Sequence, residues 1–410
     1  MKFVVATYGT EGDVRPLAAL CRALMDAGHE ATLLADHATL GVPQALGVPA
    51  RALTGDIRGT LDPSVAISNV VGKDHGLNST AKALAGIANA NAEPWLREIA
   101  EAAEGSDALI VSALAAFVGF SAAEHLGIKA IGAGFIPLSP TSDFATPFLP
   151  PSRVPRALNG LSHEFVNAML WRAFRTSTNA ARAKVFGLPP RRKNWTTHPM
   201  LYGISPSLVP PPADWPSYAH LCGQWLPPES QWAPPKALSE FLEAGEPPLY
   251  VGFGSMVGFD RAALLREVVS AVAGRRALFY PGWSGDEELE LPGNFFVLGD
   301  TPHAWLFPKV SAVIHHGGSG TTHSAARAGV PSVVVPFAGD QWFWADRLRR
   351  AGVAGDAVNG HRLKAAPLAR AIDYAEQAPV LARACRLGEQ MRTENGLAYA
   401  IQAIERIMAG

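Results

Sequence analysis

The residues that most constrain how this chain can fold are 315–346, HHGGSGTTHSAARAGVPSVVVPFAGDQWFWAD. A short apolar strand over 311–314 leads into two histidines and a glycine-rich turn. Ser and Thr side chains in the turn are good caps for a helix over 322–328 that stops at Gly329. A second strand over 332–335 and a polar loop follow. This order predicts a strand–helix–strand unit whose turn and loop meet at the carboxyl edge of one sheet.

The glycine-rich turn is expected to bind a diphosphate. A helix N-terminus presents unpaired N–H groups and roughly half a positive elementary charge, which makes it a ready site for an anion. We therefore assign Gly318, Ser319, Gly320 and Thr321 to the phosphates of a donor molecule. His316 stands beside them as a further hydrogen-bond donor, and a protonated ring would strengthen that bond.

Asp340 and Gln341 lie on the loop after the next strand. Their carboxylate and amide are of the kind that binds sugar hydroxyl groups, and they stand at the same edge of the sheet. A phosphate cradle beside such a pair predicts a nucleotide-sugar site. Each part alone has a plainer interpretation as a tight turn, a structural histidine (His315 more readily than His316) or a solvated loop. The prediction rests on the three together in this order.

Five motifs resemble those of the family 1 nucleotide-sugar glycosyltransferases, which have the two-domain GT-B fold. In chain order they are GTEGDVRP (9–16), PLSPTSDF (137–144), GFGSM (252–256), HHGGSGTT (315–322) and PFAGDQWFWADRL (336–348). They are most similar to the branch that contains the sterol glucosyltransferases and the vancomycin-pathway glycosyltransferases. The resemblance implies two doubly wound, Rossmann-like α/β domains facing across a cleft, with the acceptor on the first and the nucleotide-sugar on the second.

The length of 410 residues and the repeated strand–helix alternation agree with two α/β domains. We expect an acceptor-binding domain over 1–205 and a nucleotide-sugar-binding domain over 236–385. The proline-rich stretch 206–235 between them has the composition of an interdomain connection. In the family resemblance, the last segment, 386–410, crosses back to the first domain as a helix.

Composition excludes several other classes of protein. A formal net charge of −1 argues against a nucleic-acid binder. Three widely spaced cysteines, Cys21, Cys222 and Cys385, suggest neither a disulfide framework nor a zinc site and fit the reducing cytoplasm. The apolar stretch 108–123 is too short for a membrane span, and the N-terminal apolar run is too short for a signal peptide. Peripheral membrane contact and the oligomeric state stay open.

Asp13 is the candidate general base. The turn around it lacks a complete G-x-G-x-x-G pattern, and its carboxylate stands where a dinucleotide pyrophosphate would need to bind. An NAD-dependent oxidoreductase is therefore the disfavoured alternative. Asp13 is equally well placed as the N-cap of a helix over 14–27. In the resembling branch the matching aspartate is the proposed base. Since no histidine lies in 9–16, the runners-up are His303 and His125.

The donor is expected to be a UDP-sugar. Ser255, on the turn after a strand, is placed to add a phosphate contact, and Gly12 and Gly299 are assigned to the donor as well. Plant relatives have a base-stacking tryptophan near the position of Leu298, so recognition of the base here by backbone and apolar contacts leaves a TDP-deoxysugar as an alternative. The Asp340–Gln341 pair is associated with glucose-type donors. No Asp-x-Asp motif occurs in the chain, so we expect metal-independent transfer with inversion and no cofactor beyond the donor.

The acceptor is expected to be hydrophobic. Four aromatic residues are candidates for its pocket, although each is also compatible with an ordinary core: Trp95, Phe135, Phe144 and Phe148. The PLSPTSDF segment resembles the sterol branch, which favours a sterol, another lipid alcohol or a natural-product aglycone. A non-catalytic sugar-nucleotide binding protein is the remaining alternative, and the presence of Asp13 disfavours it.

Overall fold

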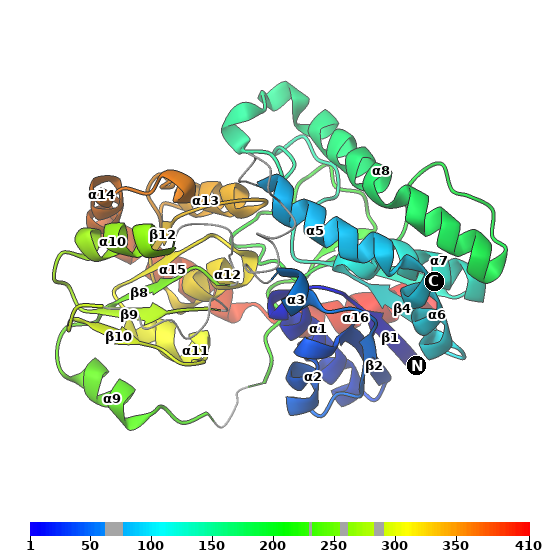
Figure 1. Ribbon diagram of the computed structural model, residues 1–410, viewed down its shortest axis with the longest axis horizontal. Coiled ribbons are helices and arrows are strands. Elements are labelled where there is room, and N and C mark those ends of the chain that lie inside the picture. The colour runs from blue at the N-terminus through cyan, green and yellow to red at the C-terminus, as the bar shows by residue number, and fades with distance from the viewer. Residues whose placement is uncertain (62–76, 229–231, 255–260, 283–290) are drawn as a thin grey trace.

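Two separate parallel sheets organise the computed structural model, which describes residues 1–61, 77–228, 232–254, 261–282 and 291–410 (Figure 1). The first sheet has the strand order β3-β2-β1-β4-β5-β6-β7 and the second β10-β9-β8-β11-β12. The strands of the first are β1 (Lys2–Ala6), β2 (Glu30–Asp36), β3 (Ala50–Leu53), β4 (Ala108–Val111), β5 (Lys129–Gly134), β6 (Met200–Tyr202) and β7 (Ala219–Leu221). Those of the second are β8 (Leu249–Gly252), β9 (Ala277–Tyr280), β10 (Phe295–Val297), β11 (Ala312–His315) and β12 (Ser332–Val334).

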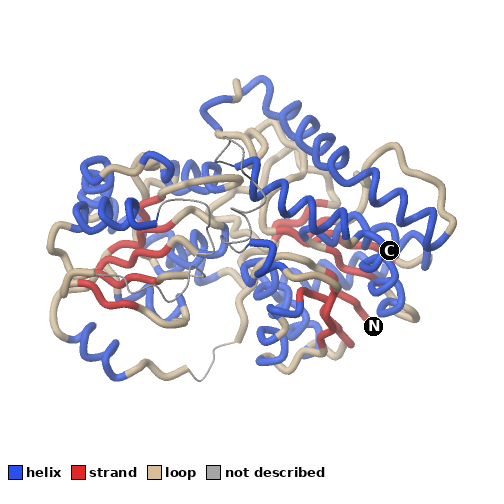
Figure 2. Tube along the Cα trace, in the orientation of Figure 1, coloured by secondary structure: helices blue, strands red, loops and turns tan. Residues whose placement is uncertain are grey.

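Helices surround both sheets, as Figure 2 shows. Those of the N-terminal domain are α1 (Glu11–Asp26), α2 (Gly41–Ala45), α3 (Ile57–Leu61), α5 (Leu77–Ala90), α6 (Ala92–Ala103), α7 (Ala116–Leu126) and α8 (Asn159–Phe186). The second half contains α9 (Lys236–Glu243), α10 (Arg261–Val272), α11 (His303–Leu306), α12 (Ser319–Ala328), α13 (Gln341–Arg350), α14 (Ala365–Ala375), α15 (Ala378–Thr393) and α16 (Gly396–Ala409). The expected pair of doubly wound α/β domains is confirmed. No helix in the described ranges combines the length and apolar character that crossing a membrane requires.

The near-continuous apolar strands are explained by burial on both faces of each sheet. Phe3 and Val5 pack into one core cluster of the N-terminal domain, whereas Val4 packs into the cluster on the opposite face. In the second sheet, Val251 and Tyr250 likewise pack into two different core clusters on opposite faces. Because successive side chains point to opposite faces, each strand stabilises two cores at once.

Helix starts differ from those expected from the sequence. Helix α1 begins at Glu11 rather than residue 14, since Thr10 is its N-cap and Asp13 occupies the third helical position of a capping box. Helix α12 begins at Ser319 rather than residue 322, directly after the turn glycine Gly318. Both shifts place the polar motif residues inside the first helical turn instead of in a loop before it.

The connection between the domains also differs from expectation. Strand β7 lies within the stretch 206–235 but pairs with β6, so the N-terminal sheet continues past residue 205. Helix α15 packs on α12 of the second domain, whereas α16 packs on α1, with Ala400 and Ile404 in the N-terminal core. The chain therefore crosses between the domains near Glu394, later than residue 386.

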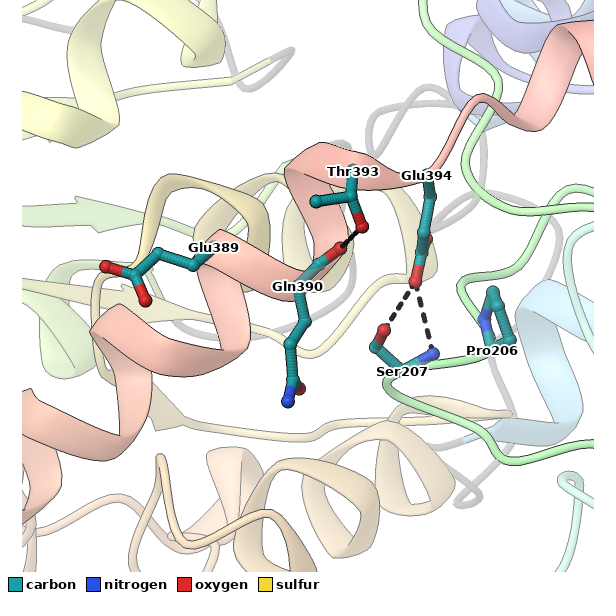
Figure 3. Close-up of a pocket in the computed structure, with 6 residues that line it drawn as sticks. All are labelled: Pro206, Ser207, Glu389, Gln390, Thr393 and Glu394. Atoms are coloured by element: carbon teal, nitrogen blue, oxygen red, sulfur yellow. Dashed lines mark hydrogen bonds between the residues drawn. The ribbon is translucent and has the colours of Figure 1, made fainter.

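Glu394, at this crossover, is hydrogen-bonded to the chain segment that follows β6 of the N-terminal sheet. Its Oε1 accepts hydrogen bonds from the Ser205 hydroxyl at 2.8 Å and from the Ser207 hydroxyl at 2.6 Å (Figure 3 shows the bonds to Ser207). Ser207 and Glu394 border a surface hollow that Pro206, Glu389, Gln390 and Thr393 also line. The hollow lies at the crossover and includes neither Asp13 nor His316.

Replacing Glu394 by Ala is expected to lower the free energy of unfolding by about 1–3 kcal/mol, because hydrogen bonds to a charged acceptor are lost and two hydroxyl donors are left without it. Chemical denaturation measures the change. Glu389→Ala is the matched control, since Glu389 lines the same hollow but is exposed. Equal stability of the two variants would show that Glu394 does not tie the domains together.

The strand orders fix where ligands can bind. In the first sheet the order reverses between β1 and β4, and in the second between β8 and β11. In open α/β sheets the crevice outside the carboxyl ends of the strands at such a reversal is the usual ligand site. Asp13 follows β1 and His316 follows β11, so each motif stands at the reversal point of its own sheet.

Candidate active site

Asp13 combines a structural and a chemical role. Asp13 is not the N-cap considered from the sequence, since Thr10 holds that place; its Oδ2 accepts the backbone N–H of Thr10 at 2.9 Å from the third helical position. Burial raises the pKa of Asp13 to about 6, against the lowering effect of the Thr10 hydrogen bond, and the carboxylate of Asp340 raises it further. A carboxylate with this pKa is a better base near neutral pH than an exposed aspartate.

Asp340 approaches from the other domain. It is the N-cap residue of α13, and its Oδ2 accepts the indole N–H of Trp344 at 2.6 Å. Burial raises the pKa of Asp340 to about 6 as well, although the Trp344 bond opposes the rise. The charge of Asp340 contributes to the raised pKa of Asp13, so the start of α13 in one domain acts electrostatically on the start of α1 in the other.

Gln341 shapes the loop that carries Asp340. The side chain is buried, and its Oε1 accepts the N–H groups of Phe337 at 2.7 Å and Ala338 at 3.0 Å. These bonds fold the loop back on the start of α13. The sequence predicted a sugar contact for Gln341. The structure shows that its carbonyl oxygen holds the loop, so any contact of Gln341 with a sugar stays a prediction.

The start of α12 has unpaired N–H groups where an anion site was expected, and phosphate binding there stays a prediction. The N–H of Thr322 is the first to bond back along the helix, to the carbonyl of Gly318 at 2.9 Å. The N–H groups of Ser319, Gly320 and Thr321 precede it and have no intrahelical acceptor. Gly320 is exposed and its two neighbours are partly exposed, which leaves this helix end accessible to a ligand.

His316 sits in a space that two glycines provide. A Cβ at Gly318 would lie 2.4 Å from its Nε2, and a Cβ at Gly254 would lie 2.9 Å from its Cε1. Burial lowers the pKa of His316 to about 4, so the ring is neutral at physiological pH and the charge-strengthened bond considered from the sequence is not available. Within the described residues its buried Nδ1 has no hydrogen-bond partner. A neutral ring with a free nitrogen at a helix N-terminus suits a ligand contact.

The other histidines have structural surroundings. His315 is fully buried, and its Nδ1 accepts the N–H of Gly317 at 3.1 Å, which supports the turn. His303 stacks on Phe307 with 4.2 Å between ring centres, and burial lowers its pKa to about 4. His125 stacks on Phe186 at 3.7 Å within the N-terminal domain.

Three remaining donor assignments have different outcomes. Gly12 is exposed on the first turn of α1, and Gly299 is exposed after β10. Beside Gly299, Asp300 forms an ion pair of 3.9 Å with Arg15 of α1, another contact between the domains. Ser255 lies outside the described residues. Leu298 is buried in the core, so its side chain is not available to a nucleotide base.

The four acceptor candidates separate clearly. The assignment of Trp95 to the acceptor pocket is wrong. Its side chain is fully buried, its ring centre lies 4.3 Å from that of Tyr8, and its indole N–H donates to the carbonyl of Thr54, so Trp95 is a core residue. Phe144 contacts the other domain, where its ring centre lies 5.3 Å from that of Phe343. Phe135 follows β5 and packs edge-on against Trp225. Phe148 is partly buried.

Sequence reasoning missed what anchors the PLSPTSDF loop. Asp214 accepts the Thr141 hydroxyl at 2.6 Å and the Ser142 backbone N–H at 2.7 Å, and these bonds lower its pKa to about 2. Tyr202 binds Ser139 in the same loop. The partners are far apart in the chain, so no local pattern could reveal them. The described ranges contain no group of three or more His, Cys, Asp or Glu side chains placed to hold a metal ion.

Two doubly wound domains, each with a polar motif at the reversal point of its sheet, form the two-domain arrangement of the GT-B fold. Two solved structures share this fold over the whole chain. CalG4, the calicheamicin glycosyltransferase, has a TM-score of 0.71 at 18% identity, covering 100% of this chain and 98% of that one. Glycosyltransferase VinC in complex with dTDP has a TM-score of 0.66 at 18% identity, covering 100% of both chains.

Sequence comparison narrows the class. Residues 269–404 match the family model described as erythromycin biosynthesis protein CIII-like, C-terminal domain. The sterol 3-beta-glucosyltransferases of Yarrowia lipolytica and Emericella nidulans are 32% and 35% identical over 431 aligned residues, each covering 99% of this chain. The chain spans only 29% and 30% of the length of those two relatives. The whole chain is therefore similar to part of these sterol 3-beta-glucosyltransferases, and it has the fold of solved glycosyltransferases.

Proposed function

We propose that the chain transfers a hexose, glucose in the first place, from a UDP-sugar to a hydroxyl of a hydrophobic acceptor such as a sterol, a lipid alcohol or a natural-product aglycone. The observation that carries the proposal is Asp13, whose raised pKa depends in part on Asp340 of the opposite domain. The names of the two sterol 3-beta-glucosyltransferase relatives support glucose and a sterol-like acceptor. A TDP-deoxysugar is the alternative donor, since exposed Gly299 offers only backbone contact to either base.

In the proposed reaction, Asp13 accepts the proton of the acceptor hydroxyl while that oxygen bonds to the anomeric carbon of the sugar. The bond between this carbon and the diphosphate breaks, and the diphosphate leaves with the electron pair. The N–H groups at Ser319–Thr321 and the neutral ring of His316 stabilise the charge on the leaving group. One base and one displacement give inversion at the anomeric carbon.

A transfer assay with a sterol and a panel of aglycones tests this proposal. We expect UDP-glucose to yield a β-glucoside, observed by NMR, at a rate that a chelator does not change. An α-glucoside would contradict inversion, and a loss in chelator that Mg²⁺ restores would contradict metal independence. Binding of UDP-glucose without any product would favour the non-catalytic binder.

The rate is expected to depend on pH through Asp13. Because only the ionised carboxylate accepts a proton, kcat/KM should fall as the pH drops through about 6, the raised pKa of Asp13 in the unliganded chain. Asp340→Asn should move the midpoint to lower pH, since it removes a charge that raises this pKa. A pH–rate profile for both proteins measures the shift. An unmoved midpoint in Asp340→Asn would contradict the coupling between the domains.

A further inference from the structure

The first half of α8 exposes an apolar stripe. Leu161, Phe165 and Met169 are 60%, 61% and 51% exposed, and Leu158 just before the helix is 46% exposed. Their spacing of four residues places the three helical side chains on one face. Eight large hydrophobic residues are exposed in the described ranges, and four of them lie within these twelve residues. Exposed apolar residues are normally scattered singly, so this clustering marks an interaction surface.

The opposite face of the same helical segment already has a structural task. Ser162 accepts the backbone N–H of Thr146 at 2.9 Å, and His163 bonds to the carbonyl of Phe144 at 3.0 Å. Phe144 in turn packs on Phe343 of the second domain. The inward face therefore holds the loop at the domain junction. The fold makes no use of the outward apolar stripe within the described residues.

Basic side chains flank the stripe. Arg153 and Arg156 precede it, and Arg172 and Arg175 follow it on the helix; all four are exposed. None of them forms an ion pair in the described part of the chain, and Glu164 is the single acidic residue between residues 153 and 175. The chain as a whole carries a net charge of −1, so this basic segment is a local feature.

The place of the segment in the fold suits a flat partner. Figure 1 shows α8 along the outer edge of the N-terminal domain. The short turn Pro151–Arg153 just before it lies against α13 of the second domain. A helix at the outer edge can lie along a flat surface. Large apolar side chains on one side together with basic side chains are features of helices that lie in a membrane interface.

We propose that residues 158–175 dock on an anionic lipid bilayer, with the apolar stripe in the boundary between headgroups and acyl chains and the arginines on lipid phosphates. Docking stands independently of sugar transfer. Together with the proposed function, it would bring the loop at Phe144 to the membrane surface, from which a lipid acceptor could enter without crossing water.

Flotation with vesicles of phosphatidylcholine, with and without phosphatidylserine, tests the proposal. We expect the wild-type chain to bind the phosphatidylserine vesicles more tightly. The triple variant Leu161→Ser, Phe165→Ser, Met169→Ser should lose at least about tenfold in partitioning, since binding scales with the apolar area inserted. Arg172→Gln with Arg175→Gln should weaken binding to the anionic vesicles only, and added salt should reduce the difference. Leu381→Ser, an exposed leucine on α15, is the matched control and should bind as wild type.

Absence of wild-type binding, or equal binding by the triple variant, would overturn the proposal and leave a protein partner as the occupant of the stripe. Equal binding to both kinds of vesicle would overturn the role of the arginines. Transfer to a water-soluble aglycone should be unchanged in the triple variant. Vesicle binding by a chain that transfers no sugar would contradict the proposed function and leave the docking surface standing.

Discussion

Replacing Asp13 by Asn lowers turnover at least ~100-fold and leaves the affinity for UDP within about twofold, because general-base catalysis contributes on that scale and a carboxamide cannot accept the proton. The fold should survive the change, since the carbonyl oxygen of Asn can still accept the N–H of Thr10 that now bonds to Oδ2. Initial rates at saturating donor and calorimetric titration with UDP separate the two effects.

Asp26→Asn is the matched control for this variant. Asp26 lies at the other end of α1, where its carboxylate is paired with Arg22 on the surface. Its loss should leave turnover unchanged. If Asp13→Asn were as active as Asp26→Asn, Asp13 would serve only the capping box with Thr10, and a different group would have to act as base.

Asp13→Asn should also change the stability of the fold, by an amount that depends on pH. Burial raises the pKa of Asp13 above its value in the unfolded chain, so the folded state binds the proton more tightly and loses stability as the pH rises from about 4 to about 6. Asp13→Asn removes this loss of stability at higher pH, because an amide does not ionise. Its melting temperature should therefore exceed that of the wild type at pH 8 and match it near pH 4.

Replacing His316 by Ala is expected to weaken binding of UDP and of the intact UDP-sugar together, by roughly 10- to 100-fold, the loss expected for one hydrogen bond to a charged phosphate. The ring is held between Gly254 and Gly318 beside the start of α12, and its Nδ1 lacks a partner in the described part of the chain. Because the ring is neutral at physiological pH, the loss should be nearly constant between pH 6 and 8.

His316→Gln gives a second test of the phosphate contact. A glutamine can donate a similar hydrogen bond without a ring, so it should recover part of the affinity that alanine loses. His37→Ala, an exposed histidine of the N-terminal domain, is the control for general effects of losing an imidazole. Unchanged affinity in His316→Ala would remove His316 from the phosphate site and leave only the helix N-terminus there.

Local patterns predicted the strands and most helices, because apolar runs and glycines at helix C-termini determine secondary structure over a few residues. They failed at the start of α1, where Thr10 and Asp13 bond reciprocally and extend the helix toward the strand. They also failed at Trp95, since a buried aromatic and a pocket aromatic look alike in sequence. Strand β7 was hidden for a third reason: its proline-rich surroundings resemble a linker, although it pairs with β6.

The candidate site was predictable motif by motif but not as a constellation. Glycine spacing pointed to the start of α12 and to His316 without any tertiary information. The influence of Asp340 on Asp13 depends on how two domains face each other, which no single motif encodes. Gln341 likewise looked like a ligand residue, whereas its oxygen holds the loop before α13. The exposed apolar stripe of α8 was missed because the same four-residue spacing is typical of a helix face that packs on a core.

Calorimetric titration of the purified chain with UDP, TDP and NADH, in the presence of a chelator, tests the central claim most directly. The structure leads us to expect binding of UDP or TDP in the micromolar range, about −8 kcal/mol, through the turn at His316 and the start of α12, and no heat with NADH. The nucleotide that binds more tightly identifies the base of the donor. Binding of NADH without either diphosphate would contradict a nucleotide-sugar site and return attention to the first strand–helix unit of the N-terminal domain.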